Sequence, residues 1–289
     1  MPDPDLPHGL VSTHWLAEHL HDADLRLLDC TVVMQFDPIG APRFTSGRTD
    51  YDKAHIPGAV FCDVMQDLCD RSHPLPMMMA SAQQVSDVMS KLGVGLGSKV
   101  ITYDRGNHAW AARAWWTLRA FGFDNCAVLD GGWQKWITEG RPTTAEVKPR
   151  PRARFEAKYR PALIASKKDV LQGIEDQNTL LINALSPADH RGETMSRALP
   201  GRIKGSKNVH AETLIDAASK AYLEKQQLRR HFEAVGARPG QRIVTYCGGG
   251  ISACSDALAL TILGFDDVAV YDGSLAEWTR DPNAPMETG

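Results

Sequence analysis

The chain repeats itself, and this internal repeat limits its fold more than any other feature of the sequence. Residues 100–136 read VITYDRGNHAWAARAWWTLRAFGFDNCAVLDGGWQKW, and residues 243–278 read IVTYCGGGISACSDALALTILGFDDVAVYDGSLAEW. In both copies the Asp of Asp-Gly lies eight residues after the Gly of Gly-Phe, and a Trp follows six residues later. Spacings that agree over several segments indicate that the chain contains two homologous domains.

Two further pairs of segments lie upstream in each copy. HIPGAVFCD at 55–63 matches RIKGSKNVH at 202–210, and LRLLDC at 25–30 matches LLINAL at 180–185. A stretch rich in Pro, Arg and Lys separates the copies, and its prolines disfavour regular structure. We therefore expect a first domain, a linker and a second domain, over residues 1–142, 143–158 and 159–289.

Short β-rich runs alternate with amphipathic helical stretches in both copies. KVITYD and VAVYD are examples of the runs, and residues 81–94 and 253–265 are examples of the helical stretches. This alternation predicts an α/β fold in which each domain has a mainly parallel central sheet flanked by helices. Ligands of such sheets bind beyond the carboxyl ends of the strands.

Composition and charge exclude several classes of function. The 32 basic and 35 acidic residues give a net charge of −3, which indicates neither a nucleic-acid partner nor a membrane partner. The N-terminus lacks the basic start and apolar core of a signal peptide, so we expect a cytoplasmic protein. The six cysteines form no CxxC pair and no cluster with zinc spacing. We therefore expect no disulfide framework, no metal and no organic cofactor.

One stretch, IVTYCGGGISACS at 243–255, combines a strand end, a cysteine and a glycine run. A loop of this kind between a strand and a helix exposes its backbone N–H groups to a common point, which is a site for an anion. The nearest anion is the thiolate of Cys247. A free cysteine has a pKa of about 8.5, and a helix N-terminus lowers it by roughly one to five units. Although a lone cysteine is usually a small buried apolar residue, this context favours a reactive Cys247.

The first copy has Asp104 at the position of Cys247, and its loop RGNHAWA is not rich in glycine. We therefore expect the first domain to be non-catalytic and the second domain to be catalytic.

With these motifs the chain resembles the rhodanese-type sulfurtransferases in their tandem two-domain form, which include thiosulfate and 3-mercaptopyruvate sulfurtransferases. HIPGAVF at 55–61, ARAWWTLRAFG with VLDGGWQKW, and CGGGISA at 247–253 carry the resemblance over nearly the whole chain. It implies that Cys247 takes a sulfane sulfur from a small donor, becomes a persulfide, and passes the sulfur to a thiol or cyanide. The residues implied in substrate binding are Gly248, Gly249, Gly250, Ile251, Ser252, Ala253 and Arg197.

The chain departs from the family pattern around this loop. The mercaptopyruvate enzymes carry Ser where this chain has Gly249, and the thiosulfate enzymes carry Arg and Lys where it has Gly248 and Gly249. A family histidine falls on Met77, and of two substrate-binding arginines one falls on Asp189 and the other on Arg197. Without loop cations, thiosulfate is bound by backbone amides and the helix dipole alone. Without the Ser and His, the leaving enolate of mercaptopyruvate loses its proton donors, and such assistance contributes about 10²–10⁴-fold. We therefore predict weak turnover of both standard donors.

Two other functions remain open at this stage. A cysteine phosphatase needs an arginine in the loop to hold the phosphoryl oxygens, and residues 248–253 contain none. A non-catalytic persulfide-sensing or binding module agrees with the missing Ser, His and Arg, but the retained Cys247 and its glycine loop oppose it. Turnover separates these readings, because an enzyme yields many sulfur atoms per protein and a sensor yields one.

Overall fold

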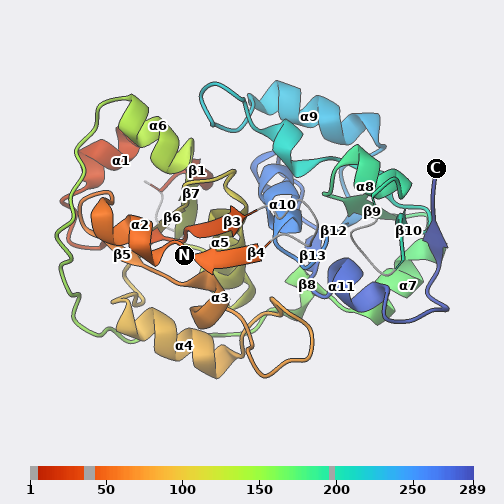
Figure 1. The fold of residues 1–289 in the computed structure, drawn as a ribbon, viewed down its shortest axis with the longest axis horizontal. Helices are drawn as coiled ribbons and strands as arrows, with labels where there is room; N and C mark the ends of the chain where they lie inside the picture. Colours follow the sequence, from red (N-terminus) through yellow and green to blue (C-terminus); the bar gives the residue numbers. More distant parts are fainter. Residues whose placement is uncertain (1–5, 36–42, 195–198) are drawn as a thin grey trace.

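Two five-stranded sheets form the centre of the computed structural model, which describes residues 6–35, 43–194 and 199–289 (Figure 1). Every strand pair in both sheets is parallel. The first sheet has the order β1 (Gly9–Val11), β7 (Cys126–Leu129), β6 (Lys99–Tyr103), β2 (Leu25–Asp29), β5 (Ala59–Phe61). The second repeats this order as β8 (Ile164–Ala165), β13 (Val268–Tyr271), β12 (Arg242–Tyr246), β9 (Thr179–Asn183), β11 (Lys207–Asn208). The prediction of two homologous α/β domains is confirmed.

Equivalent side chains make equivalent contacts in the two domains. The Ile56 N–H faces the Tyr103 hydroxyl at 3.4 Å, and the Ile203 N–H faces the Tyr246 hydroxyl at 3.1 Å. The match of HIPG with RIKG is therefore structural.

The match of LRLLDC with LLINAL is wrong by one residue. Asp29 Oδ1 accepts the N–H of Thr31, and Asn183 Oδ1 accepts the N–H of Leu185, both at 3.0 Å. Asp29 therefore corresponds to Asn183 and not to Ala184. The apolar letters align equally well in either register, but the turn after each strand needs the Asp or Asn two residues before the bonded N–H.

Helices surround both sheets, and two of them pack together where the domains meet (Figure 1). Short two-stranded antiparallel ribbons join β3 (Val32–Gln35) to β4 (Arg43–Ser46) and β10 (Arg202–Ile203) to β14 (Met286–Glu287). The helices of the first domain are α1 (Thr13–His19), α2 (Arg48–Lys53), α3 (Val64–Asp67), α4 (Ala82–Lys91), α5 (Ala109–Ala120) and α6 (Gly132–Thr138). Those of the second are α7 (Lys167–Glu175), α8 (Pro187–Arg191), α9 (Lys225–Ala234), α10 (Ser252–Ile262) and α11 (Ser274–Trp278).

Helices α5 and α10 are the pair at the domain interface. Nearly every residue of both helices is buried, as expected of helices that are apolar on all sides. Buried residues of the two domains form one continuous apolar cluster through this contact. Helix α5 begins five residues after Asp104, and α10 begins five residues after Cys247. The interface between the two helices therefore also positions the loops that precede them.

The stretch expected as a linker lies along the first domain as an extended strap. Thr144 exchanges two backbone hydrogen bonds with His55, and the Ala153 N–H donates to the Ser90 carbonyl. Phe155 is buried with its ring 5.5 Å from that of Phe123. The prolines exclude helix, and the strap instead gains its stability from contacts with the first domain.

Helix α10 buries a carboxyl group, and this group predicts a pH dependence of stability. Asp256 is fully buried, and neither of its carboxyl oxygens accepts a hydrogen bond from the described residues. Burial raises its pKa well above the usual range. The folded chain therefore keeps a proton that the unfolded chain releases, so stability falls as pH rises above about 4, by up to ~1.4 kcal/mol per pH unit.

We expect Asp256→Asn to remove this contribution, so that the free energy of unfolding falls less between pH 5 and pH 8 than in the parent chain. Urea unfolding at several pH values measures the difference. Asp266→Asn, at an exposed position in the same domain, is the matched control. Equal slopes for Asp256→Asn and the parent chain would show that Asp256 is ionised when folded.

Candidate active site

Cys247 directly follows β12, a central strand of the second sheet, and α10 begins five residues later. The thiol lies at the carboxyl end of the sheet, where the alternation of strands and helices predicted a site. Cys247 is 2% exposed. Its carbonyl accepts the N–H of Leu275 at 3.1 Å, and the Gly248 carbonyl accepts the N–H of Ala276 at 2.8 Å. The start of α11 therefore holds this end of the loop.

The loop after Cys247 leaves a group of N–H donors without acceptors. Among the described residues nothing accepts a hydrogen bond from the backbone N–H groups of Gly248, Gly249, Ile251, Ser252 and Ala253. Unsatisfied backbone donors in a folded interior are costly. Such a concentration next to a cysteine forms a cradle for negative charge at the start of a helix.

The first domain shows what such a cradle holds. Asp104 occupies the position of Cys247, and its carboxylate accepts four backbone N–H bonds of 2.8–3.2 Å from Gly106, His108, Trp110 and Ala111. Counted from Asp104 and from Cys247, the equivalent residues of the second domain are Gly249, Ile251, Ala253 and Cys254. The two loops have equal length but not identical backbones, since the positive φ lies at His108 in the first domain and at Gly250 in the second. The N–H of Cys254 also donates to the Ile251 carbonyl. The first domain thus shows that N–H groups at these positions can converge on an acidic side chain.

Ser274, the first residue of α11, holds the loop after Cys247. Its hydroxyl accepts the N–H groups of Cys247 and Gly250, both at 3.1 Å, and donates to the Tyr271 carbonyl at 2.8 Å. Ser274 is fully buried and has a φ of +46°, which is rare for a residue with a side chain. The first domain has Gly132 at this position, and the exchange of Gly for Ser within the repeat was the signal in the sequence.

A buried ion pair joins the two domains beside the loop. Arg113, from α5, donates to Asp272 Oδ1 at 2.5 Å and to the Gly250 carbonyl at 3.3 Å. Burial alone lowers the pKa of Arg113, but the Asp272 carboxylate more than offsets this effect and the pKa lies above its ordinary value. The second oxygen of Asp272 accepts the N–H of Met79 at 2.7 Å. Asp272 is therefore a centre of contacts between the domains.

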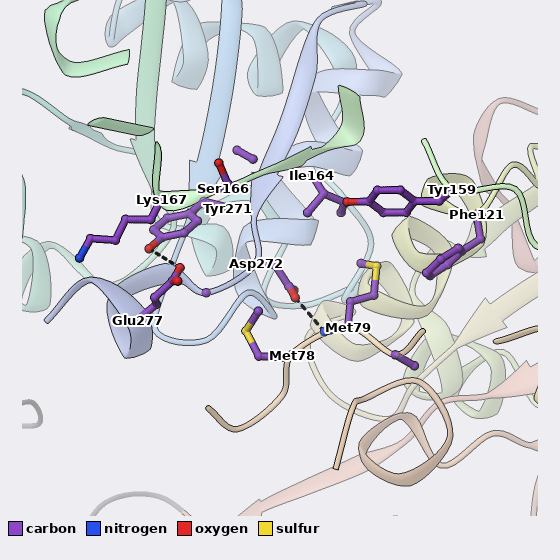
Figure 2. Close-up of a pocket in the computed structure, with 13 residues that line it drawn as sticks. Met78, Met79, Phe121, Tyr159, Ile164, Ser166, Lys167, Tyr271, Asp272 and Glu277 are labelled. Carbon is purple, nitrogen blue, oxygen red and sulfur yellow. Dashed lines mark hydrogen bonds between the residues drawn. The ribbon is translucent and has the colours of Figure 1, made fainter. Parts of the chain in front are cut away.

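The hydrogen bond between the Asp272 carboxylate and the Met79 N–H lies at the edge of a cavity, as Figure 2 shows. The cavity has a volume of about 310 Å³. Met78, Met79 and Phe121 of the first domain form one side of the cavity, and Tyr271 lies opposite them with its hydroxyl bonded to Glu277 at 2.7 Å. Cys247 is not among the residues that line it. The cavity follows the domain interface and is separate from the thiol.

The positions at which the chain departs from the family pattern lie in different surroundings. Met77 is half-buried with a φ of +62°, and its carbonyl accepts Arg113 Nη2 at 2.9 Å. The Asp189 carboxylate accepts the hydroxyls of Ser186 and Thr194 at 2.6 and 2.5 Å. Arg197 lies outside the described residues. Among the expected site residues the structure thus brings together Cys247 and the loop 248–253.

Cys254 is a packed residue of the first helical turn. Its thiol donates to the Gly250 carbonyl at 3.2 Å, and burial raises its pKa to about 12. It stays protonated near pH 7 and helps to hold the loop. The described residues contain no group of three or more His, Cys, Asp and Glu side chains arranged to hold a metal ion. In the same residues no helix has the length and apolar character needed to cross a bilayer.

The glycines of the loop have different roles, which two substitutions separate. A Cβ at Gly250 would lie 2.7 Å from the Asp272 carbonyl oxygen, and Gly250 has a φ of +76°. A Cβ at Gly249 would meet nothing within 4 Å. We expect Gly250→Ala to destabilise the fold by about 2–4 kcal/mol and Gly249→Ala to change stability by less than about 1 kcal/mol. Urea unfolding of both variants provides the measurement, and equal losses would contradict this geometry.

Comparison with known proteins identifies the family of the chain. The family model for the rhodanese-like domain matches residues 12–139 and again residues 166–281. The chain is 32% identical to mouse thiosulfate sulfurtransferase, with 98% of this chain and 95% of the relative covered. It is also 32% identical to human 3-mercaptopyruvate sulfurtransferase, with 96% and 94% covered.

Among solved structures, a 3-mercaptopyruvate sulfotransferase from Escherichia coli superimposes with a TM-score of 0.82. That protein is 29% identical and the match covers 93% of this chain and 99% of the other. The two matches to one family model correspond to the two sheets. The chain therefore belongs to the rhodanese-like family, as a sulfurtransferase of the tandem two-domain form.

Proposed function

We propose that the chain moves a sulfane sulfur from a small donor of the thiosulfate or 3-mercaptopyruvate type through a persulfide on Cys247 to a thiol or cyanide. One observation carries this proposal above the others. The cradle of unsatisfied N–H groups surrounds Cys247, and the equivalent cradle of the first domain holds the Asp104 carboxylate. Donors preorganised around a position of negative charge favour formation of that charge.

The reaction has two displacement steps. In the first, the Cys247 thiolate attacks the outer sulfur of the donor, and the bond between that sulfur and the rest of the donor breaks. Thiosulfate then leaves as sulfite, and mercaptopyruvate leaves as the enolate of pyruvate, which takes a proton. In the second, the acceptor attacks the outer sulfur of the persulfide and Cys247 leaves as the thiolate. The N–H groups of the loop stabilise the terminal sulfur between the steps.

The charges near the loop support weak turnover of both standard donors. Residues 248–253 carry no cation, and Arg113 is committed to Asp272. Arg191 is paired with Glu193 at 2.6 and 2.9 Å. A mercaptopyruvate donor also needs a proton at the leaving enolate, and Gly249 and Met77 provide no acidic group. A thiol persulfide, which leaves as a thiolate without this protonation, suits the site better.

The other candidate is a persulfide-sensing or binding module. Cys247 is 2% exposed and the loop lacks an acid, which favours slow exchange with solvent acceptors. A sensor and an enzyme share the first displacement step and differ in the second.

Intact-mass measurement tests the proposal. The protein is incubated with thiosulfate, 3-mercaptopyruvate or glutathione persulfide, then treated with cyanide while thiocyanate is assayed. We expect a mass increase of one sulfur atom that cyanide discharges, with several thiocyanates formed per chain. One thiocyanate per chain, without further turnover, supports the module. No adduct with any of the three donors rejects sulfur transfer.

A further inference from the structure

A second cavity lies on the first domain, far along the chain from Cys247. It has a volume of about 210 Å³ and opens between α2, β5, the end of α4 and the strap at 147–150. Four cationic side chains line it, and no Asp or Glu does. We refer to this cavity as the basic pocket, defined by Arg48, Lys91, Lys148 and Arg150.

The positive charges of the basic pocket are poorly neutralised. Arg48 pairs with Asp52 at 2.8 Å and Lys148 pairs with Glu146 at 3.3 Å, but in both pairs each side chain is more than half exposed. Exposed pairs of this kind contribute little and exchange readily for a better partner. Burial raises the pKa of the nearby Asp67 carboxyl, and the charge of Lys91 offsets only part of this effect. Arg150 donates to the Gly58 carbonyl at 3.4 Å, which carries no formal charge.

The positive charge of the basic pocket also acts on a neighbouring arginine, Arg26. Arg26 Nε donates to the Gly93 carbonyl at 2.6 Å, which fixes the guanidinium near the strap. Burial and then the charge of Arg150 lower the pKa of Arg26. Two guanidinium groups are thus held close enough to repel each other, and a bound anion would relieve this repulsion.

Apolar side chains also line the basic pocket. Phe61 and Val147 contribute to it, and Val147 is 46% exposed. The Arg48 guanidinium lies 5.7 Å from the centre of the Phe61 ring, and this contact orients its donors. A ligand that combines clustered negative charge with an apolar body therefore matches the whole surface.

We propose that the basic pocket binds a small phosphate ester or diphosphate that carries at least two negative charges. Arginine presents its N–H donors in a fork that matches phosphate oxygens, and lysine adds point charge. Arg48 and Lys91 come from the first domain, whereas Lys148 and Arg150 come from the strap. The bound ligand would therefore link the strap to the first domain, at a site separate from Cys247.

Calorimetric titration with ADP and with pyrophosphate, each at 20 and 200 mM salt, tests this inference. Lys91→Glu with Lys148→Glu is compared with Lys168→Glu plus Lys225→Glu, which makes the same change in net charge at exposed sites of the second domain. We expect saturable binding that weakens with salt, weakens at least about tenfold in the first variant, and is unchanged in the control.

Two results would overturn the inference. One is the absence of saturable heat with both probes at 20 mM salt, and the other is equal weakening in the two double variants. Sulfur loading of Cys247, measured by mass, is expected to be unchanged in both variants. A parent chain that binds ADP but takes no sulfur would reject the proposed function and leave the basic pocket in place.

Discussion

Cys247→Ser is expected to abolish sulfur loading and to lower thiocyanate formation by about 10⁴-fold or more. A serine hydroxyl is a far weaker nucleophile than a thiolate near pH 7 and forms no persulfide. Serine is close to cysteine in size, and the N–H of residue 247 still reaches the Ser274 hydroxyl. We therefore expect the variant to fold, and circular dichroism with mass measurement after donor treatment checks both points.

Cys254→Ser is the matched control for this result. Cys254 is buried beside the same loop, but its thiol donates to the Gly250 carbonyl, a bond that a serine hydroxyl also makes. We expect this variant to load one sulfur atom as the parent chain does. If Cys247→Ser still takes up sulfur and Cys254→Ser does not, Cys254 is the nucleophile and the site described above is rejected.

The sequence was sufficient to single out Cys247 as the candidate nucleophile because its strand, loop and helix are contiguous. A glycine run after a β-rich segment is a local pattern, and the physical argument for an anion site needs no distant residue. Aligning the two copies was equally sufficient to place Asp104 at the position of Cys247. What the sequence did not show is that the Asp104 carboxylate occupies the cradle itself, since this depends on backbone directions in the loop.

The contacts that hold the loop could not be predicted in this way. Arg113 and Asp272 are 159 residues apart in sequence, and either residue alone looks like a solvated charge or a turn. Their pairing follows from the packing of α5 against α10, which brings the first domain onto the loop after Cys247. The exchange of Gly132 for Ser274 within the repeat marks the position of Ser274, but only the folded chain shows that its hydroxyl accepts the N–H groups of Cys247 and Gly250.

Arg113→Met is expected to destabilise the protein by about 3–5 kcal/mol, because it leaves the Asp272 carboxylate buried without its cation. The side chain of Arg113 is 0% exposed and that of Asp272 is 5% exposed, so water cannot replace the lost partner. The carbonyls of Gly250 and Met77 also lose a donor. The loop after Cys247 and the chain segment around Met77 are thereby released together, so we expect sulfur loading to slow as well. Urea unfolding and the rate of the mass increase measure the two effects.

Charge and packing contributions to this loss are separated by a second substitution. Arg113→Met combined with Asp272→Asn removes both charges and retains an oxygen that accepts the Met79 N–H. We expect the double variant to recover more than half of the stability lost by Arg113→Met. Arg119→Met, on the same helix, is the control, since Arg119 lies 3.7 Å from Asp124, which Arg160 holds at 2.7 Å. A double variant no more stable than the single one would show that hydrogen bonds to the two carbonyls, and not the ion pair, hold the domains at this loop.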